Sequence, residues 1–382
     1  MTETLLNKRI LFVFSRLELG GAERQGLLLA QHLRDHCGAK LQVAGLQGEP
    51  GELSKLCDAA EIPCVPLRLG AMQTSINCLL ALVKFVKWLR REQPDLLVSY
   101  TRNANVFSGL AWRVCGARGV VWNQADEGLN LDGELASRLS VFLTPSFISN
   151  SSGGAAFLRD RYGVPANKLR VIHNGIALAP PVMTNLEWRK RIGILDGEFA
   201  VCMVANISRF KDHDTLLKAW RQVLNRVAPV KPVLLMAGRC DRPKEEIIGL
   251  CNALELGDRV RLLGAVDDVS GLLAASNMFV YSSRSEGVPN AVVEAMAASL
   301  PVVGTDIPGI RDAVGDVGAR FLATPGEPGE LAEIIVQLMG DSRLRLRYGE
   351  ELRIRAKEEF SLHRMLERSA ESFAAVLEEG TW

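Results

Sequence analysis

Residues 281–299 read Tyr-Ser-Ser-Arg-Ser-Glu-Gly-Val-Pro-Asn-Ala-Val-Val-Glu-Ala-Met-Ala-Ala-Ser, which predicts a loop followed by a helix. A short apolar run ends near Val280, so a buried strand should precede this polar loop with its Gly and Pro. Asn290 is a good N-cap for the helix. Such loops lie at the carboxyl edge of a parallel sheet, where ligands bind. We therefore expect Glu286 and Glu294 to face one ligand site.

The same alternation of short apolar runs and helical periods extends along the whole chain. Strands are predicted at residues 10–14, 41–44, 65–67, 96–99, 120–122, 147–149 and 170–172, and then at 199–205, 233–237, 261–263, 278–280, 302–304 and 319–322. Helices are predicted, among others, at residues 23–33, 76–92, 153–162, 215–227, 244–254 and 291–298. A length of 382 residues exceeds what one core usually supports. The fold class is therefore α/β, with two doubly wound domains at 1–178 and 179–382 that join at the Pro-containing stretch 178–183.

The charge of the chain is nearly balanced, and its distribution is uneven. The net charge of +1 gives no nucleic-acid footprint. Residues 1–178 contain 20 Lys and Arg against 15 Asp and Glu, and the remainder contains 25 against 29, so the two parts carry +5 and −4. A basic first domain could rest on an anionic bilayer or hold an anionic acceptor.

The sequence also indicates the compartment. The apolar run near the N-terminus is too short to span a membrane and lacks a small-residue cleavage site. Eight cysteines are scattered without metal-ligand spacing, which favours core thiols over disulfides or zinc. We expect a cytoplasmic protein.

Three further motifs accompany Glu286-x7-Glu294 and the Leu300–Gly309 segment after it. They are the pair Gly20-Gly21, the stretch Val-Ile-His-Asn-Gly-Ile at 171–176, and Lys-Asp-His-Asp-Thr-Leu-Leu-Lys at 211–218. Together these segments resemble the donor-site signature of family 4 glycosyltransferases, which have the GT-B fold. The resemblance covers nearly the whole chain, and its C-terminal motif is specific.

The resemblance implies two Rossmann-like domains that face each other across a cleft. The nucleotide-sugar donor would bind mainly to the second domain and the acceptor to the first, and the last helix, about 362–382, would return to the first domain. The implied reaction is transfer of a hexosyl group from a nucleoside diphosphate, with UDP expected, to an acceptor hydroxyl with retention. Such enzymes act in cell-surface polysaccharide or glycolipid synthesis.

The resemblance also assigns roles to residues. Glu286 would hold the donor sugar and Glu294 the ribose, because carboxylates accept hydrogen bonds from hydroxyl groups. Lys211, and with it Arg209, would stabilise the departing diphosphate. Arg209 is included because the position where the family usually has an Arg is Asn206 here. The predicted donor-binding residues are Gly20, Gly21, Asn206, Gly287, Val288, Pro289, Asn290 and Glu294.

Two glycines in sequence, Gly20 and Gly21, let a backbone approach a ligand closely at a helix N-terminus. From these residues alone, a plain tight turn explains the pair equally well. The motif is not a dinucleotide fingerprint, because G-x-G-x-x-G is absent.

The loop after the strand at 120–122 is expected to contact the acceptor or the donor sugar. Many family members have a His near this point, and this chain has none. Its candidate replacements are Asn123, Gln124, Asp126 and Glu127. A loop with a helix-capping Asp is the competing interpretation.

Two motifs receive structural interpretations. Asp212-His213-Asp214 resembles a D-x-D metal motif, but we expect Asp214 to cap a helix that starts at Thr215, and we predict no metal and no other cofactor. His173 is expected to make a structural hydrogen bond.

Residues 79–91 (Leu-Leu-Ala-Leu-Val-Lys-Phe-Val-Lys-Trp-Leu-Arg-Arg) predict a basic amphipathic helix. Its apolar stripe consists of Leu82, Phe85, Val86 and Leu89. A helix packed on a sheet is favoured over one lying on a membrane, although peripheral membrane contact stays open.

Two other functions remain open at this point. One is a non-catalytic subunit that binds a sugar nucleotide, which Asn206 and the missing His allow. The other is a sugar-nucleotide epimerase of the same fold. Under the transferase hypothesis the partners are a nucleotide-sugar donor and a glycan or lipid-linked acceptor, and the sequence leaves the sugar and the linkage undetermined.

Overall fold

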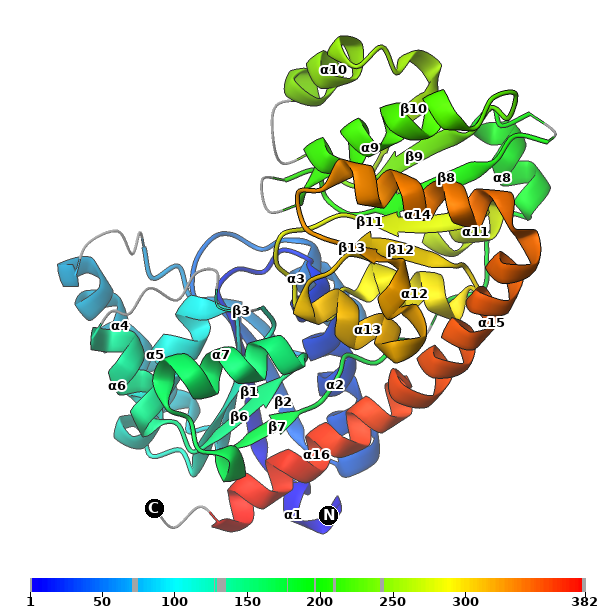
Figure 1. Ribbon diagram of the computed structural model, residues 1–382. Helices are drawn as coiled ribbons and strands as arrows, with labels where there is room; N and C mark the ends of the chain where they lie inside the picture. The colour runs from blue at the N-terminus through cyan, green and yellow to red at the C-terminus, as the bar shows by residue number, and fades with distance from the viewer. Residues whose placement is uncertain are drawn as a thin grey trace. The chain divides into compact units, whose positions relative to one another are not determined.

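Two parallel sheets, each wrapped by helices, organise the chain in a computed structural model (Figure 1). The structure describes residues 2–70, 75–126, 128, 135–176, 178–195, 197–208, 211–240 and 244–379. One compact unit comprises Met1–Gly175 together with Leu362–Trp382, and the second comprises Ile176–Ser361. The chain passes from the first unit to the second after Gly175, whereas the sequence predicted the boundary after residue 178. The C-terminal helix, from Leu362, belongs to the first unit.

The first unit contains a seven-stranded sheet in the order β3-β2-β1-β4-β5-β6-β7. Its strands are β1 (Arg9–Phe14), β2 (Lys40–Gly45), β3 (Cys64–Pro66), β4 (Leu96–Tyr100), β5 (Gly119–Gln124), β6 (Ser146–Ser149) and β7 (Leu169–Val171). Its helices are α1 (Thr2–Leu5), α2 (Gly21–Cys37), α3 (Glu52–Ala59), α4 (Ser75–Glu92), α5 (Arg102–Cys115), α6 (Leu135–Leu143), α7 (Ser152–Tyr162), a short 3-10 helix (Ala166–Lys168) and α16 (Leu362–Glu379).

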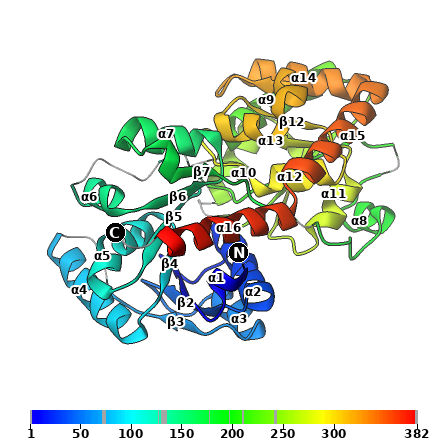
Figure 2. The same cartoon turned by 90° about the horizontal axis from the view of Figure 1, so that it is seen from below.

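Alternate side chains of β1 supply the cores on the two faces of this sheet. Phe12 and Phe14 pack with residues of α2 and α16, whereas Leu11 and Val13 pack with residues of α4 and α5. Figure 2 shows α16 running alongside α1 and α2. Because both faces are covered, the strands are continuous apolar runs, which explains why their positions could be predicted.

The second unit contains a six-stranded sheet in the order β10-β9-β8-β11-β12-β13. Its strands are β8 (Ala200–Val204), β9 (Val233–Ala237), β10 (Val260–Gly264), β11 (Met278–Tyr281), β12 (Val302–Thr305) and β13 (Leu322–Ala323). Its helices are α8 (Asn185–Arg191), α9 (His213–Arg226), α10 (Lys244–Ala253), α11 (Val269–Ala275), α12 (Asn290–Ala297), α13 (Pro308–Gly318), α14 (Pro328–Gly340), α15 (Ser342–Glu359) and two 3-10 helices (Gly257–Arg259 and Ala319–Phe321).

The strand predicted at 319–322 is wrong. Ala319–Phe321 forms a 3-10 helix, and the strand is Leu322–Ala323, which pairs with Gly304 and Thr305. The buried ring of Phe321 packs against the ring of Tyr348, with centroids 4.3 Å apart. This contact draws the apolar residue into the core from a helical turn instead of from a strand.

Two predicted helix caps are also wrong. Asn290 is the first helical residue of α12, and Pro289 occupies the cap position without a side-chain bond. Helix α9 begins at His213, so Asp214 lies in its first turn, and Asp212 is the cap residue. Asp212 accepts a hydrogen bond from the Thr215 hydroxyl at 2.8 Å.

Candidate functional site

Lys211 and Glu286 form an ion pair between two neighbouring loops of the second unit. Lys211 lies between β8 and α9, and Glu286 lies between β11 and α12, so both follow the carboxyl ends of adjacent strands. Lys211 Nζ contacts Glu286 Oε1, and the two side chains are only 16% and 17% exposed. The structure therefore brings together the two residues predicted to act on the donor.

Tyr281 and Ser283 position this pair, and the sequence reasoning missed both. Lys211 Nζ donates to the Tyr281 hydroxyl at 2.9 Å and lies 5.2 Å from the centre of its ring. Glu286 Oε1 accepts hydrogen bonds from Ser283 Oγ at 2.8 Å and from Tyr281 at 3.4 Å. Ser283 is held in turn by Thr305, whose hydroxyl accepts from the Ser283 amide at 3.0 Å and donates to its carbonyl at 2.7 Å.

Asp212 fixes the backbone that carries Lys211. The Asp212 amide donates to the Ser282 carbonyl at 3.1 Å, and Ser282 Oγ donates back to the Asp212 carbonyl at 2.8 Å. The buried Asp212 carboxylate also pairs with Arg284, at 3.4 Å. Asp212 of the Asp-His-Asp motif thus serves the loop structure. Within the described part of the chain, no group of three His, Cys, Asp or Glu side chains could hold a metal ion.

Glu294, on α12, lies near enough to Tyr281 for its charge to act on the phenol that contacts Lys211. Burial raises the pKa of Tyr281 well above its usual value, and the negative charges of Glu286 and Glu294 raise it further. Tyr281 therefore stays protonated at neutral pH and can donate to Glu286 while it accepts from Lys211. Glu294 is half-buried on α12.

The backbone between Glu286 and α12 is packed tightly. Gly287, Val288 and Pro289 are buried and Asn290 is half-buried. A β-carbon at Gly309 would collide with the carbonyl oxygens of Glu286 and Gly287, so only glycine lets α13 approach this loop so closely. Pro289 has no amide hydrogen, which removes one of the amides expected at this helix N-terminus.

Asn206, which occupies the position where the family usually has an Arg, hydrogen-bonds to the backbone of Arg239. Its Oδ1 accepts from the Arg239 amide at 3.2 Å, and the Arg239 carbonyl accepts from the Ile207 amide at 2.8 Å. Arg239 is exposed at the end of β9, the strand next to β8. Arg239 was not among the predicted site residues, although it follows a strand at the same edge of the sheet as Lys211. Arg209 lies outside the described residues.

The glycine pair of the first unit has an acidic neighbour. Gly20 is the cap residue of α2, and Gly21 is the first residue of that helix. A β-carbon at Gly20 would lie 2.6 Å from Glu23 Oε2, so the glycine makes room for this carboxylate. Burial raises the pKa of Glu23, and hydrogen bonds from the Glu23 and Gly20 amides partly oppose the shift. The backbone amides at the start of α2, which were predicted to face a ligand anion, thus include two that hydrogen-bond to the Glu23 carboxylate.

The residues predicted to replace the family's histidine point mostly into the first unit. The buried Asn123 donates to the Ser99 carbonyl at 3.1 Å. The buried Gln124 accepts from the Trp122 indole at 2.9 Å and donates to Asp126 Oδ1 at 2.8 Å. Asp126 also accepts from the Gly128 amide at 2.8 Å, and Glu127 lies outside the described residues. The side-chain amides of Asn123 and Gln124 are therefore already hydrogen-bonded within the protein, and a ligand could bind to them only by displacing those hydrogen bonds.

His173 makes the structural hydrogen bond expected of it. Its Nδ1 lies 2.9 Å from the Asn150 carbonyl oxygen.

The described cysteines form no disulfide, and most are buried or half-buried, but Cys240 beside Arg239 is exposed.

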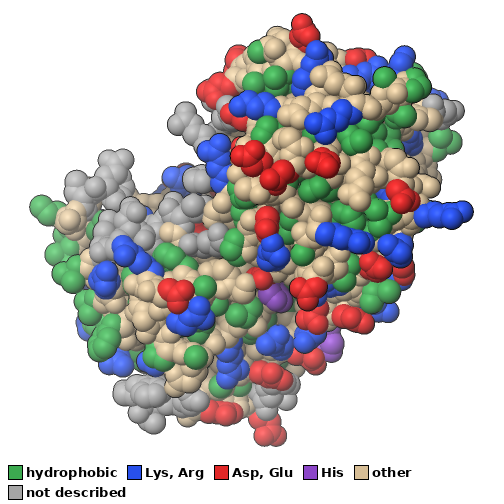
Figure 3. All heavy atoms as spheres, in the orientation of Figure 1, with side chains coloured by type: hydrophobic (Ala, Val, Ile, Leu, Met, Phe, Trp, Pro, Cys, Tyr) green, Lys and Arg blue, Asp and Glu red, His purple; other side chains and the backbone are tan. Residues whose placement is uncertain are grey.

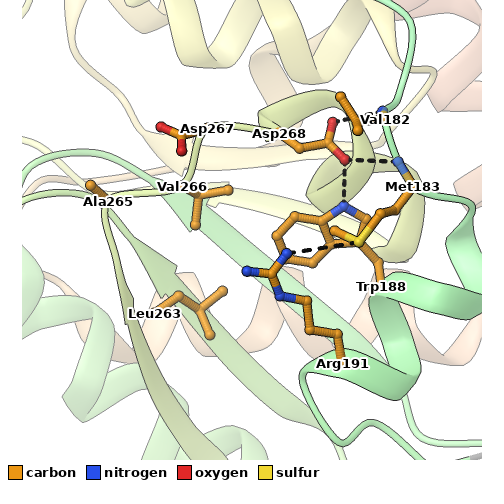
Figure 4. Close-up of a pocket in the computed structure, with 9 residues that line it drawn as sticks. All are labelled: Val182, Met183, Trp188, Arg191, Leu263, Ala265, Val266, Asp267 and Asp268. Carbon is orange, nitrogen blue, oxygen red and sulfur yellow. Dashed lines mark hydrogen bonds between the residues drawn. The ribbon is translucent and has the colours of Figure 1, made fainter.

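A hollow of about 400 Å³ lies elsewhere in the second unit (Figure 4). Its lining includes Trp188, Arg191 and Asp268 but none of the predicted site residues. The Asp268 carboxylate points at the Trp188 indole and the amides of Val182 and Met183, at 2.7, 3.2 and 3.1 Å. Its oxygens are thus used in joining the segment before α8 to α11.

Two family models together match most of the chain. Residues 184–355 match "Glycosyl transferases group 1", and residues 19–179 match "Glycosyltransferase Family 4". An N-acetyl-alpha-D-glucosaminyl L-malate synthase of Bacillus anthracis is 30% identical over 52% of this chain, and the match spans half of that relative. The lipopolysaccharide core biosynthesis glycosyltransferase LpsE of Rhizobium meliloti is 27% identical over 72% of this chain and 74% of its own length.

Solved structures share the fold over nearly the full length. Anabaena HepE, crystallised with UDP and glucose, has a TM-score of 0.82 at 23% identity and covers 97% of this chain and 100% of its own. The sucrose-phosphate synthase of Thermosynechococcus elongatus has a TM-score of 0.77 at 20% identity, with coverage of 97% and 100%. The likeness confirms the predicted class of two Rossmann-like units, the GT-B fold.

Proposed function

The chain belongs to the group 1 glycosyl transferases of glycosyltransferase family 4, and on that premise we propose that it transfers a sugar from a nucleoside diphosphate to an acceptor hydroxyl. UDP is the expected carrier, and the expected outcome is retention at the anomeric carbon. The proposed acceptor is a glycan or a lipid-linked glycan in cell-surface polysaccharide or glycolipid synthesis. The proposed location is the cytoplasm, with peripheral contact at the inner membrane face left open.

The observation that carries this proposal is the pairing of Lys211 with Glu286 against Tyr281. Sugar transfer builds negative charge on the departing diphosphate, and a half-buried cation positioned in advance stabilises such charge strongly. Glu286 holds Lys211 in place before the donor binds. When the donor is present, the Lys211 ammonium, with its three donors, serves the diphosphate as well.

The two carboxylates act as positioning groups. Glu286 accepts from sugar hydroxyls, and Glu294 accepts from the ribose. Glu286 Oε1 already accepts from Lys211, Tyr281 and Ser283, which suits a group that holds its neighbours in place. On this proposal, no glycosyl-enzyme forms through a pair of carboxylates, as it does in retaining glycosidases.

Names of relatives support the acceptor class. One relative from Campylobacter jejuni is named as an N-acetylgalactosaminyltransferase that acts on a diphospho-undecaprenol-linked sugar. Another, CapM of Staphylococcus aureus, is named for capsular polysaccharide biosynthesis. Neither name fixes the sugar for this chain.

The test is donor hydrolysis across a panel of UDP-, GDP- and ADP-sugars. The wild type should slowly release nucleoside diphosphate from one donor, and Lys211→Ala or Glu286→Ala should reduce the rate by about 100-fold, the range seen when one stabilising donor is removed. Lys190→Ala, which removes an exposed lysine on α8, is the matched control. If the wild type binds UDP but turns over no donor with any acceptor, the protein is a sugar-nucleotide-binding subunit and the transferase proposal fails.

A further inference from the structure

Two thiols meet inside the first unit, whose surface in Figure 3 carries a mixture of basic and acidic side chains. Cys57 lies on α3 and Cys64 lies on β3, and the two side chains hydrogen-bond to each other. Helix α3 and strand β3 are in contact, and Figure 2 shows both at the same edge of the unit. We call Cys57 and Cys64 the thiol pair. Neither residue belongs to the site at Lys211 and Glu286.

A helix-terminating turn holds the two thiols in place. Glu61, just after α3, has a left-handed backbone with a φ of 53°. Its amide donates to the Asp58 carbonyl at 3.0 Å. The Ile62 amide donates to the Cys57 carbonyl at 2.9 Å, and these two bonds form a Schellman motif, which reverses the chain. Strand β3 therefore begins at Cys64, only two residues after Ile62.

The two thiols differ in their access to solvent. Cys57 is fully buried in a core cluster that also contains Leu53 and Ile62, and Cys64 packs partly against this cluster. Cys64 is half-buried on β3, which is an edge strand of the seven-stranded sheet. A small oxidant from solvent therefore reaches Cys64 first, and Cys57 lies behind it.

Hydrogen bonds favour ionisation of the more accessible thiol. Cys64 Sγ lies 3.8 Å from Ser54 Oγ, and Ser54 Oγ accepts from the Gly51 amide at 3.2 Å. The pKa of Cys64 is lowered chiefly by its bond with Cys57 and further by Ser54, against the opposing effects of burial and of the Asp58 charge. The same bond and burial raise the pKa of Cys57. The thiolate, which is the nucleophilic form, is thus favoured at Cys64.

We propose that the thiol pair is an oxidation site at which hydrogen peroxide forms a disulfide between Cys57 and Cys64. The Cys64 thiolate attacks one peroxide oxygen, the O–O bond breaks, and the other oxygen takes a proton and leaves as water, so Cys64 becomes a sulfenic acid. The Cys57 sulfur then loses its proton and attacks the Cys64 sulfur. The S–O bond breaks, and the hydroxyl group takes that proton and leaves as a second water. Two protons and two electrons thus pass from the thiols to the peroxide.

The disulfide would tie α3 to β3 and, through α3, hold the loop between β1 and α2. The Leu53 amide donates to the Leu17 carbonyl at 3.1 Å, and Leu17 and Pro50 form an isolated parallel bridge. A β-carbon at Gly51 would lie 2.5 Å from the Leu17 carbonyl oxygen, so α3 approaches this loop closely. The same loop ends at Gly20, the cap residue of α2. The loop should therefore be more rigid in the oxidised protein than in the reduced one.

The test is treatment of the full-length protein with hydrogen peroxide, followed by denaturation, labelling of free thiols with N-ethylmaleimide and digestion with trypsin. Cleavage after Lys55 and Arg68 places Cys57 and Cys64 in one peptide, residues 56–68. After oxidation this peptide should carry no label and be lighter by two hydrogens than the reduced, unlabelled peptide. Treatment with dithiothreitol before labelling should restore both labels.

Cys251 is the internal control, because it is half-buried like Cys64 but burial raises its pKa. Its peptide should keep the label in the same sample. Two variants test the order of the steps. Cys57→Ser should stop at a sulfenic acid on Cys64, which dimedone traps. Cys64→Ser should give neither a disulfide nor a trapped sulfenic acid in peptide 56–68.

Melting and hydrogen exchange of the wild type keep the inference falsifiable if a variant folds poorly. Closure of this short loop should raise the melting temperature by about 5 °C. It should also slow hydrogen exchange in residues 15–20 relative to the reduced protein.

Three results would overturn the inference. Peptide 56–68 could keep both labels at a peroxide concentration that oxidises Cys251, or Cys57 could be linked to a cysteine other than Cys64. A disulfide that forms without slowing exchange in residues 15–20 would overturn the coupling to the loop. Donor hydrolysis enters none of these measurements, so the oxidation site and the proposed transferase activity can fail separately.

Discussion

The Tyr281 hydroxyl lies between Lys211 and Glu286, 2.9 Å from the lysine nitrogen and 3.4 Å from the carboxylate oxygen. Its raised pKa keeps it neutral, so one phenol accepts from the cation and donates to the anion at the same time. The ion pair and the phenol therefore form one network, and removing any member changes the position of the others.

Tyr281→Phe should lower the rate of donor hydrolysis by up to about thirtyfold with little change in fold. The substitution removes two hydrogen bonds worth about 1 kcal/mol each but keeps the ring, which stacks near Phe279 with centroids 6.1 Å apart. Steady-state kinetics with the active donor measure the effect. Tyr348→Phe is the control, because the Tyr348 hydroxyl donates to the Val302 carbonyl in the core. The control should lower the melting temperature without changing the rate. Equal rates for Tyr281→Phe and the wild type would show that the phenol has no part in positioning Lys211.

Arg239 should supply the positive charge for the nucleoside diphosphate that the family usually obtains from an Arg at the position of Asn206. Arg239→Ala is expected to weaken binding of the nucleoside diphosphate about tenfold, which corresponds to the loss of one hydrogen bond to a charged group. Titration calorimetry with UDP measures this, and Arg239→Lys should retain most of the affinity. Arg226→Ala, near the end of α9, provides the comparison. Should Arg239→Ala bind UDP as tightly as the wild type, the cation must come from elsewhere in the chain.

The sequence predicted the sheets better than the site, and the reason is physical. A strand such as β9 (Val233–Ala237) is buried on both faces, so its apolar run has sharp ends that can be read directly. Lys211 and Glu286 were found because their motif resembles a known family. Tyr281 and Ser283 were not found, because only the folded loop brings their hydroxyls to Glu286. Asn123 and Gln124 look like ligand-binding residues in sequence, yet their amides satisfy buried groups.

Glu23 should make the first unit less stable as the pH rises. Its folded pKa is raised by burial, so the folded state holds the proton more tightly than the unfolded chain, where the pKa is about 4.3. The resulting stabilisation is present below about pH 4.3 and is lost as the pH rises through the raised folded value. Glu23→Gln should therefore melt at a higher temperature than the wild type at pH 7.5 and at nearly the same temperature at pH 4. Calorimetry at both values checks this, with Glu3→Gln as an exposed control. A Glu23→Gln protein that melts lower than the wild type at pH 7.5 would mean that the amide bonds to the carboxylate outweigh its burial.

Asp268 should be a main support of the segment that enters the second unit. Burial raises the pKa of its carboxyl, but hydrogen bonds from Trp188 and from the amides of Val182, Gly271 and Met183 outweigh burial, so the pKa lies below its usual value. A lowered folded pKa means stability that is present above the unfolded value of about 3.9 and is lost as the pH falls through the folded value. Asp268→Ala should lower the free energy of unfolding by about 1–3 kcal/mol at pH 7, since it removes a helix cap and leaves the indole donor of the buried Trp188 unpaired. The adjacent, exposed Asp267→Ala should change it by less than about 0.5 kcal/mol. Urea unfolding at pH 7 and pH 3.5 measures both variants, and the gap between Asp268→Ala and the wild type should narrow at the lower pH. A gap that is the same at both values would show that the contribution of Asp268 comes from packing and not from its charge.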